Sequence, residues 1–224
     1  MYNLILLAAG REKRFDKKNK LFVEISGKPL ICHPLETFEN DKHCKSIVVV
    51  TREEYLDTLN SICKDKKYSK VKKIVIGGEK RQNSVNIGIK YFTDDEFLLA
   101  VHSVTYPFVS EKELNNLYFA ALEEDAVTLG HPLEESVKVT DKTMHVAEIE
   151  SRDNRWISHS PTMTSIENWR RAYSNGDNMT EKPSDEASML IRAGVKVQLV
   201  PDFRSNIPIY TTFDWKLSAK QTNG

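Results

Sequence analysis

The sequence lacks the features that would point to a membrane or to a nucleic acid. None of its apolar runs approaches the roughly 20 residues that a membrane-spanning helix requires. Lys and Arg together number 32, and so do Asp and Glu, so the chain has no overall charge that would favour an anionic partner. We therefore expect no nucleic acid and no membrane among its partners.

Cysteine and signal-peptide features are also scarce. The 224 residues include three cysteines, Cys32, Cys44 and Cys63, with no CxxC or metal-ligand spacing. Cysteines of this number and spacing are typical of reduced thiols in a cytosolic protein. The first ten residues have neither the charged leader nor the long apolar segment of a signal peptide. We therefore expect a cytoplasmic location.

Short apolar runs of strand length alternate with segments of helical spacing along most of the chain. The apolar runs lie at residues 4–7, 47–50, 73–76, 97–101, 126–129 and 195–200. Helical spacing occupies residues 29–38, 53–63, 84–91, 111–123, 165–173 and 184–193. This alternation predicts an α/β fold, with a Rossmann-like, mainly parallel sheet flanked by helices. We expect residues 1–224 to form one domain whose ligands bind at the carboxyl ends of the strands.

One region, residues 134–157, breaks the alternation. Two short stretches of alternating apolar and polar residues, 136–139 and 144–149, flank Asp141 and Lys142. This pattern predicts a β-hairpin, which would form a protruding arm at about residues 132–158. A hairpin with so few apolar residues is seldom stable alone, so we expect it to pack on a second subunit and form a homodimer.

The N-terminal strand opens into a segment suited to a polyanion. The apolar run of residues 4–7 ends in Ala8, Ala9 and Gly10, small residues that let backbone N–H groups approach a phosphate closely. Six cations follow within ten residues: Arg11, Lys13, Arg14, Lys17, Lys18 and Lys20. The segment predicts a nucleoside triphosphate at the carboxyl end of the first strand.

Other stretches carry polar groups but are ambiguous alone. Gly77 and Gly78 end a strand ahead of Arg81 and Ser84, which is compatible with a phosphate-binding turn or with an ordinary turn and a capped helix. Arg152 lies in a polar segment that either clamps a second phosphate or forms a solvated turn. Residues 205–212 resemble a strand that ends in hydroxyl groups.

Taken in order, these stretches resemble the 2-C-methyl-D-erythritol 4-phosphate cytidylyltransferase family and the related enzymes that make CDP-ribitol. The matching pieces are LLAAG, GGEKRQNSV, VHSVTYPF, ESVK, SRDNRW, SDEAS and NIPIYTT. The resemblance implies transfer of CMP from CTP to a sugar-alcohol phosphate in isoprenoid biosynthesis, with release of pyrophosphate. A ribitol-5-phosphate cytidylyltransferase remains an alternative, as does an impaired homologue that binds nucleotide or a partner without turnover.

The resemblance also implies roles for individual residues. Arg14 and Lys20 would face the triphosphate and act in catalysis, together with Arg152. The nucleotide would be bound by Ala8, Ala9, Gly10, Gly78, Arg81, Ser84 and Ser103. The acceptor would be bound by Ser136, Arg152 and Ser184, with the arm residues reaching the neighbouring subunit's site.

The chain departs from the family pattern at several of these positions. Ser103 stands where the family has a metal-binding Asp, Tyr106 replaces an Arg, and Pro208 replaces a Lys that meets the phosphates. The segment that reads QTPQ in the family is His159-Ser160-Pro161-Thr162 here. Mg²⁺ is expected for the family, but a neutral hydroxyl is a poor ligand for it, so no metal ligand is assigned. Substitutes for the missing groups would be Asp185, Glu186, His102 or the nearby lysines.

Overall fold

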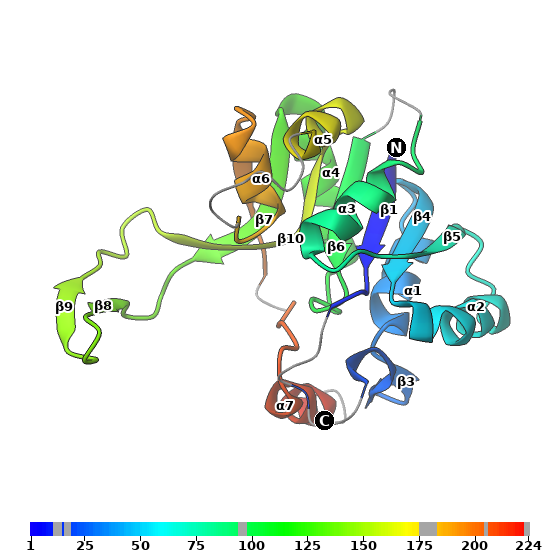
Figure 1. Cartoon of the computed structure of the whole chain (residues 1–224), viewed down its shortest axis with the longest axis horizontal. Coiled ribbons are helices and arrows are strands. Elements are labelled where there is room, and N and C mark those ends of the chain that lie inside the picture. Colours follow the sequence, from blue (N-terminus) through cyan, green and yellow to red (C-terminus); the bar gives the residue numbers. More distant parts are fainter. Residues whose placement is uncertain (11–14, 16–18, 94–97, 175–182, 204–205, 222–224) are drawn as a thin grey trace.

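A seven-stranded sheet forms the centre of the computed structural model (Figure 1), which describes residues 1–10, 15, 19–93, 98–174, 183–203 and 206–221. Its strands are β1 (Tyr2–Leu7), β4 (Cys44–Thr51), β5 (Val71–Ile76), β6 (Leu98–Ser103), β7 (Ala126–Pro132), β10 (Trp156–Ser165) and β11 (Val197–Pro201). Their order across the sheet is β11-β7-β10-β6-β1-β4-β5. Strand β10 runs antiparallel to both neighbours, and every other pairing in this sheet is parallel.

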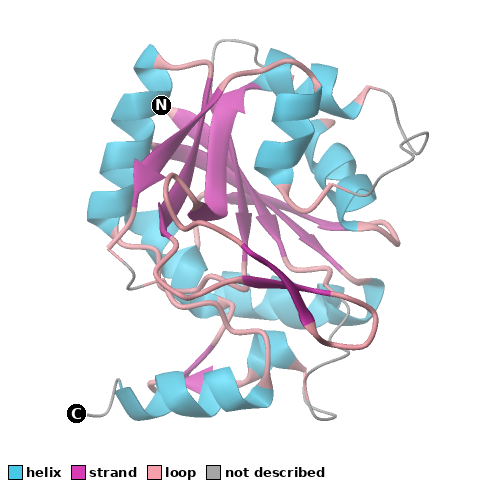
Figure 2. Cartoon of the chain, turned by 90° about the vertical axis from the view of Figure 1, so that its left-hand side faces the viewer, coloured by secondary structure: helices cyan, strands magenta, loops and turns pink. Residues whose placement is uncertain are grey.

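Helices cover both faces of this sheet, as Figure 2 shows. One face packs on α1 (Cys32–Asn40), α2 (Leu56–Asp65) and α4 (Glu111–Glu123), and the other on α3 (Arg81–Ile89), α5 (Ile166–Tyr173) and α6 (Glu186–Arg192). Strand β1 supplies both cores because side chains alternate along a strand: Leu4 and Leu6 join the first core, Ile5 and Leu7 the second. The predicted α/β fold, mainly parallel and flanked by helices, is confirmed.

A small layer of short elements lies below the sheet in Figure 1. It contains the 3₁₀ turn η1 (Lys20–Phe22), strands β2 (Glu24–Ile25) and β3 (Lys28–Pro29), and the C-terminal helix α7 (Thr212–Gln221). The indole Nε1–H of Trp215 in α7 donates to the backbone oxygen of Glu24 at 2.8 Å. The C-terminal helix therefore supports the segment that carries Lys20. A second 3₁₀ turn, η2 (Glu53–Tyr55), precedes α2.

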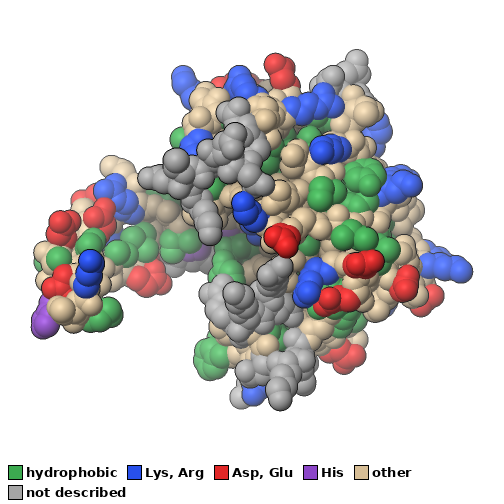
Figure 3. All heavy atoms as spheres, viewed as in Figure 1, with side chains coloured by type: hydrophobic (Ala, Val, Ile, Leu, Met, Phe, Trp, Pro, Cys, Tyr) green, Lys and Arg blue, Asp and Glu red, His purple; other side chains and the backbone are tan. Residues whose placement is uncertain are grey.

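The arm is a two-stranded hairpin that extends away from the body of the molecule (Figure 1). Strands β8 (Lys138–Thr140) and β9 (Val146–Ile149) pair antiparallel, and the Asp141 carboxylate accepts the backbone N–H groups of Thr143 and His145 in the turn. Met144 is 79% exposed and Ile149 78%. Figure 3 shows such hydrophobic side chains on the arm among charged ones. The predicted hairpin is confirmed.

Two sequence expectations about the local structure need correction. The segment expected as a strand at 205–212 has no strand among its described residues, 206–212. Its backbone instead makes isolated hydrogen bonds. The N–H of Ile209 donates to the Thr105 oxygen at 2.8 Å, and the N–H groups of Tyr210 and Thr211 donate to the Asp214 carboxylate at the start of α7. In addition, sequence patterns did not predict β10, which is a long strand inside the sheet.

No helix in the described ranges has both the length and the apolar character needed to cross a membrane.

Candidate functional site

A cavity of about 380 Å³ opens where β1, β5 and β6 end; we call it the strand-end cavity. Eight of the sequence-predicted site residues line it: Ala8, Ala9, Gly10, Lys20, Gly78, Arg81, Ser84 and Ser103. The strand ends are held in register by backbone bonds, such as those from Ala8 N–H to Val50 and from Gly77 N–H to Thr51, both 2.7 Å. Ligands of parallel sheets bind at this edge, so the fold gathers these residues at the expected place.

The glycine turn after β5 lies directly against the turn after β1. A Cβ atom on Gly77 would come within 2.7 Å of Ser84 Oγ and 2.9 Å of Ala9 Cβ, so the approach requires glycine. The hydroxyl of Ser84 accepts the backbone N–H of Gly78 at 3.2 Å, which fixes the turn on the first residues of α3. Ser84 thus shapes the wall of the strand-end cavity.

Lys20 brings a buried positive charge to this cavity. It begins η1, whose N-cap Asn19 accepts the backbone N–H of Leu21 at 3.0 Å. The side chain is held by a hydrogen bond from Nζ to Thr105 Oγ1 at 2.9 Å, and the residue is only 9% exposed. An ammonium held this way is oriented before an anion binds. Arg14, the other predicted catalytic cation of this segment, lies outside the described residues.

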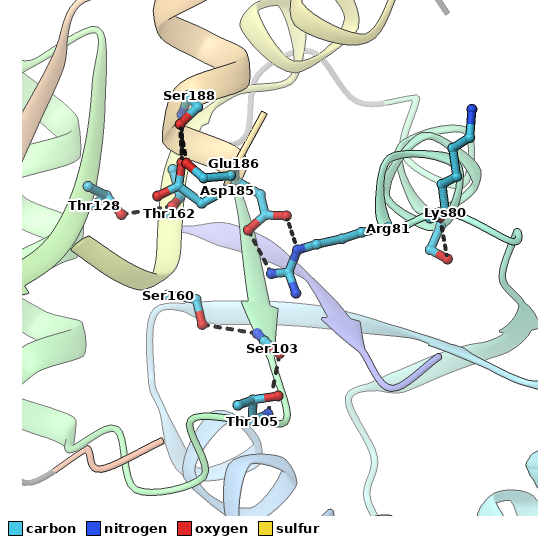
Figure 4. Close-up of polar contacts among 12 residues, drawn as sticks. Lys80, Arg81, Ser103, Thr105, Thr128, Ser160, Thr162, Asp185, Glu186 and Ser188 are labelled. Atoms are coloured by element: carbon cyan, nitrogen blue, oxygen red, sulfur yellow. Dashed lines mark hydrogen bonds and ion pairs between the residues drawn. The ribbon is translucent and has the colours of Figure 1, made fainter. Parts of the chain in front are cut away.

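Arg81 is oriented by a carboxylate, Glu186, that the sequence analysis considered as a substitute for the missing metal ligand. Its Nε and Nη2 donate to the two carboxylate oxygens of Glu186, each at 2.7 Å (Figure 4). Burial alone would lower the pKa of Arg81, but the adjacent Glu186 carboxylate raises it above its ordinary value. Glu186 is nearly buried, with 4% of its side chain exposed, whereas the Arg81 side chain is 46% exposed. The guanidinium is therefore charged, fixed at one edge and accessible at the other.

A second cavity, of about 520 Å³, adjoins the first and is called the α6 cavity here. Arg81 and Tyr210 line both cavities, and Ser184 and Asp185 line the second from the start of α6. Burial would raise the pKa of Asp185, but hydrogen bonds from Ser188 and Ser158 lower it. Asp185 is the N-cap of α6, so its carboxylate holds the wall of the cavity in place.

The residues at the end of β6 do not form a site for directly bound Mg²⁺. The hydroxyl of Ser103 accepts a hydrogen bond from the backbone N–H of Thr105 at 3.3 Å. The backbone N–H of Ser103 donates to Ser160 Oγ at 3.1 Å (Figure 4). Among the described residues that line the strand-end cavity, Glu79 at its exposed rim is the only acid. Mg²⁺ in phosphate sites is usually held by one or two carboxylates, which position 103 does not provide.

The suggested substitutes for the missing carboxylate are otherwise engaged. Asp185 and Glu186 line the α6 cavity, where they cap a helix and bind Arg81. The ring of His102 is buried against Phe38, with centroids 5.2 Å apart, and its Nε2–H donates to the Tyr106 carbonyl at 2.8 Å. Burial lowers the pKa of His102 to about 3, so the ring is neutral at pH 7. It is a structural histidine.

The arm residues lie apart from both cavities within one chain. Ser136 and Arg152 are exposed, and neither lines the strand-end cavity or the α6 cavity. Arg152 donates to the backbone oxygen of Glu134, and Ser136 accepts from Lys138. Ser184, by contrast, lines the α6 cavity, so the predicted acceptor residues divide between the body and the arm.

Among the residues that border the site, sequence reasoning gave no role to Thr105 or Tyr210. Thr105 holds Lys20, and Tyr210 lines both cavities with its hydroxyl 2.9 Å from that of Tyr106. Both fall inside quoted motifs, VHSVTYPF and NIPIYTT, so their position in those motifs was the available signal.

Comparisons with known proteins give a family and a fold for the chain. A sequence model of the 2-C-methyl-D-erythritol 4-phosphate cytidylyltransferase family matches residues 2–221. An enzyme of that name from Halalkalibacterium halodurans is 31% identical over 214 residues, covering 95% of this chain and 93% of the relative. One from Dictyoglomus thermophilum is 32% identical, covering 94% and 91%. A 4-diphosphocytidyl-2C-methyl-D-erythritol synthase structure from Anaerococcus prevotii superposes with a TM-score of 0.86 at 23% identity, covering 100% of this chain and 98% of the other.

Proposed function

The chain belongs to the 2-C-methyl-D-erythritol 4-phosphate cytidylyltransferase family, and from this we propose that it transfers CMP from CTP to 2-C-methyl-D-erythritol 4-phosphate. The observation that carries the proposal is the strand-end cavity, which collects the seven residues that the resemblance assigns to the nucleotide together with the predicted catalytic Lys20. The proposed enzyme is one domain over residues 1–224 with the arm, and its free cysteines suit a cytoplasmic location.

The proposed reaction is an in-line displacement at the α-phosphorus of CTP. A phosphate oxygen of the acceptor forms the new P–O bond, and the bond to the bridging oxygen of the β-phosphate breaks, so pyrophosphate leaves with the electron pair. Such chemistry depends on positioning and charge neutralisation. Backbone N–H groups of Ala9 and Gly10 would bind the phosphates, whereas the N–H groups of Ala8 and Gly78 already bond to the Val50 oxygen and to Ser84 Oγ. Lys20 would neutralise charge as it builds up. No step is assigned to a protein-bound metal.

The acceptor is proposed to bind in the α6 cavity. This cavity shares Arg81 with the strand-end cavity, so a phosphate bound beside Ser184 would lie next to the nucleotide. The Arg81 guanidinium, fixed by Glu186, would then face both phosphate groups. Ser136 and Arg152 would complete this pocket from the arm of a second subunit, because neither reaches it within its own chain.

A pyrophosphate-release assay tests the function directly. With CTP, Mg²⁺ and 2-C-methyl-D-erythritol 4-phosphate, we expect pyrophosphate and a CDP-alcohol in equal amounts. UTP in place of CTP is the matched control for the base. Release with ribitol 5-phosphate instead would identify the related cytidylyltransferase. Binding of CTP without turnover of either acceptor would leave an impaired homologue, an outcome that Ser103 and Pro208 make worth measuring.

The homodimer in this proposal is tested by complementation between two damaged chains. Lys20→Met removes a cation from the body and Arg152→Met removes one from the arm, so each homodimer should be weakly active. If the arm acts on the partner's site, a mixed dimer contains one intact site, and mixing should restore a measurable fraction of activity. Arg155→Met, which changes another exposed arginine of the arm, is the control and should remain active alone. Failure to regain activity in mixed dimers verified by mass would contradict action across subunits.

A further inference from the structure

Three side chains that the proposed reaction does not use meet at the root of the arm. Asp202 Oδ2 lies 3.1 Å from His131 Nδ1 and also contacts His159 Nε2. One potential ligand atom from each residue lies within 4.8 Å of the others. We call these three residues the His–Asp cluster.

The register of three neighbouring strands builds this cluster. In the pairing of β10 with β7, Ile157 is opposite His131, and His159 lies two residues further along, so both imidazoles project from the same face. On the other side, the N–H of Asp202 donates to the Gly130 oxygen at 3.0 Å, which extends the pairing of β11 with β7 to the residue beside His131. The cluster is therefore set by backbone hydrogen bonds of the sheet rather than by mobile side chains.

The burial and convergence of the cluster suit a bound cation. The side chain of Asp202 is fully buried and that of His159 is only 3% exposed, so the cluster lies away from bulk water. His131 Nδ1 and His159 Nε2 approach the same carboxylate oxygen, Asp202 Oδ2, from two neighbouring strands. Three nitrogen and oxygen ligand atoms therefore converge on one point inside the protein.

We propose that the His–Asp cluster binds one divalent transition-metal ion of the zinc class. Its ligands are His131 Nδ1, His159 Nε2 and the Asp202 carboxylate. Two imidazoles and one carboxylate suit Zn²⁺, whereas Mg²⁺ prefers oxygen ligands alone. With the ion bound through Nε2, His159 Nδ1 would face the Ser160 carbonyl oxygen, which lies 3.4 Å away, as is usual for metal-binding histidines. Water completes the coordination from the side of His131, whose side chain is 24% exposed.

The ion stabilises the structure at the junction of body, arm and α6 cavity. It links β7 and β10, the strands from which the arm departs and to which it returns, to the residue that follows β11. The ring of Tyr106 stacks on His159, with centroids 5.0 Å apart and planes 17° apart. Both rings line the α6 cavity, so the metal fixes part of the proposed acceptor pocket without contacting the reacting phosphates.

Metal binding by the full-length protein tests this inference. After treatment with a chelator and dialysis, titration with Zn²⁺ alone should fill one site per chain. Co²⁺ should give the visible absorption bands of a site with nitrogen and oxygen ligands. His131→Gln and Asp202→Asn should each weaken Zn²⁺ binding by more than about 100-fold. His145→Gln, which changes an exposed arm histidine outside the cluster, is the matched control and should bind as tightly as the parent.

Two outcomes would overturn the assignment. If the parent protein takes up no stoichiometric Zn²⁺ or Co²⁺, the cluster is a hydrogen-bonded structural contact instead. If Zn²⁺ binding survives in folded His131→Gln and Asp202→Asn chains, the ion binds elsewhere. The Co²⁺ spectrum of the parent decides the first point even where a variant fails to fold. Because no CTP is present, either failure leaves the proposed cytidylyl transfer untouched.

Discussion

Lys20→Met should lower kcat/KM for CTP by roughly 100- to 1,000-fold, the loss usual when one oriented charge is removed from a site that stabilises developing negative charge. The ammonium is buried, directed by Thr105 and placed in the strand-end cavity, so no solvent reorganisation is needed when the triphosphate arrives. Methionine keeps the length and flexibility of the side chain and removes its charge. The measurement is steady-state pyrophosphate release, with CTP varied at saturating acceptor.

Lys80→Met is the matched control for this change. Lys80 lines the same cavity but is exposed at the N-cap of α3, where water screens its charge. We expect its kcat/KM to stay within a few-fold of the parent value. If Lys20→Met and Lys80→Met lowered kcat/KM equally, only the overall charge of the cavity would determine the rate. An unaffected, correctly folded Lys20→Met enzyme would remove Lys20 from the catalytic machinery.

The sequence predicted the strand-end cavity well because each of its parts is local. The turns after β1 and β5 are marked by small residues, and residues that follow parallel strands converge at one edge of the sheet. The family resemblance assigned Ala9, Gly78 and Ser84 to one nucleotide site, and all three line the cavity. The arm was predictable for the same reason, since alternation over a few residues and a turn at Asp141 are sufficient to indicate a hairpin.

The parts that the sequence did not predict depend on contacts between distant segments. Strand β10 is polar for a strand within a sheet, and its hydroxyl groups are satisfied only by partners such as Thr128, whose Oγ1 lies 2.8 Å from that of Thr162. Hydrophobic periodicity does not detect such pairing between polar side chains. Glu186 orients Arg81 from 105 residues away, and the His–Asp cluster joins three strands. No local pattern encodes either arrangement.

The double change Ser103→Asp and Pro208→Lys should raise the Mg²⁺-dependent kcat/KM by at least about tenfold. It restores two charges that the family motifs have and this chain lacks. A carboxylate at the end of β6 would face the strand-end cavity, where position 103 now offers a hydroxyl, and would supply the ligand that Mg²⁺ prefers. Position 208 lies two residues before Tyr210, which lines both cavities, so we expect a lysine there to add positive charge near the cavity edge.

Ser103→Asn combined with Pro208→Lys separates the effect of the new carboxylate from that of its shape. Asparagine has nearly the size of aspartate but no charge, so this pair should show little of the Mg²⁺-dependent gain. Ser103 is buried and its N–H is bound by Ser160, so both side chains face the same steric demand and any folding cost is shared. If the aspartate and asparagine pairs have equal kcat/KM at every Mg²⁺ concentration, position 103 is not where a metal acts, and this chain neutralises the triphosphate with Lys20 and its neighbouring cations instead.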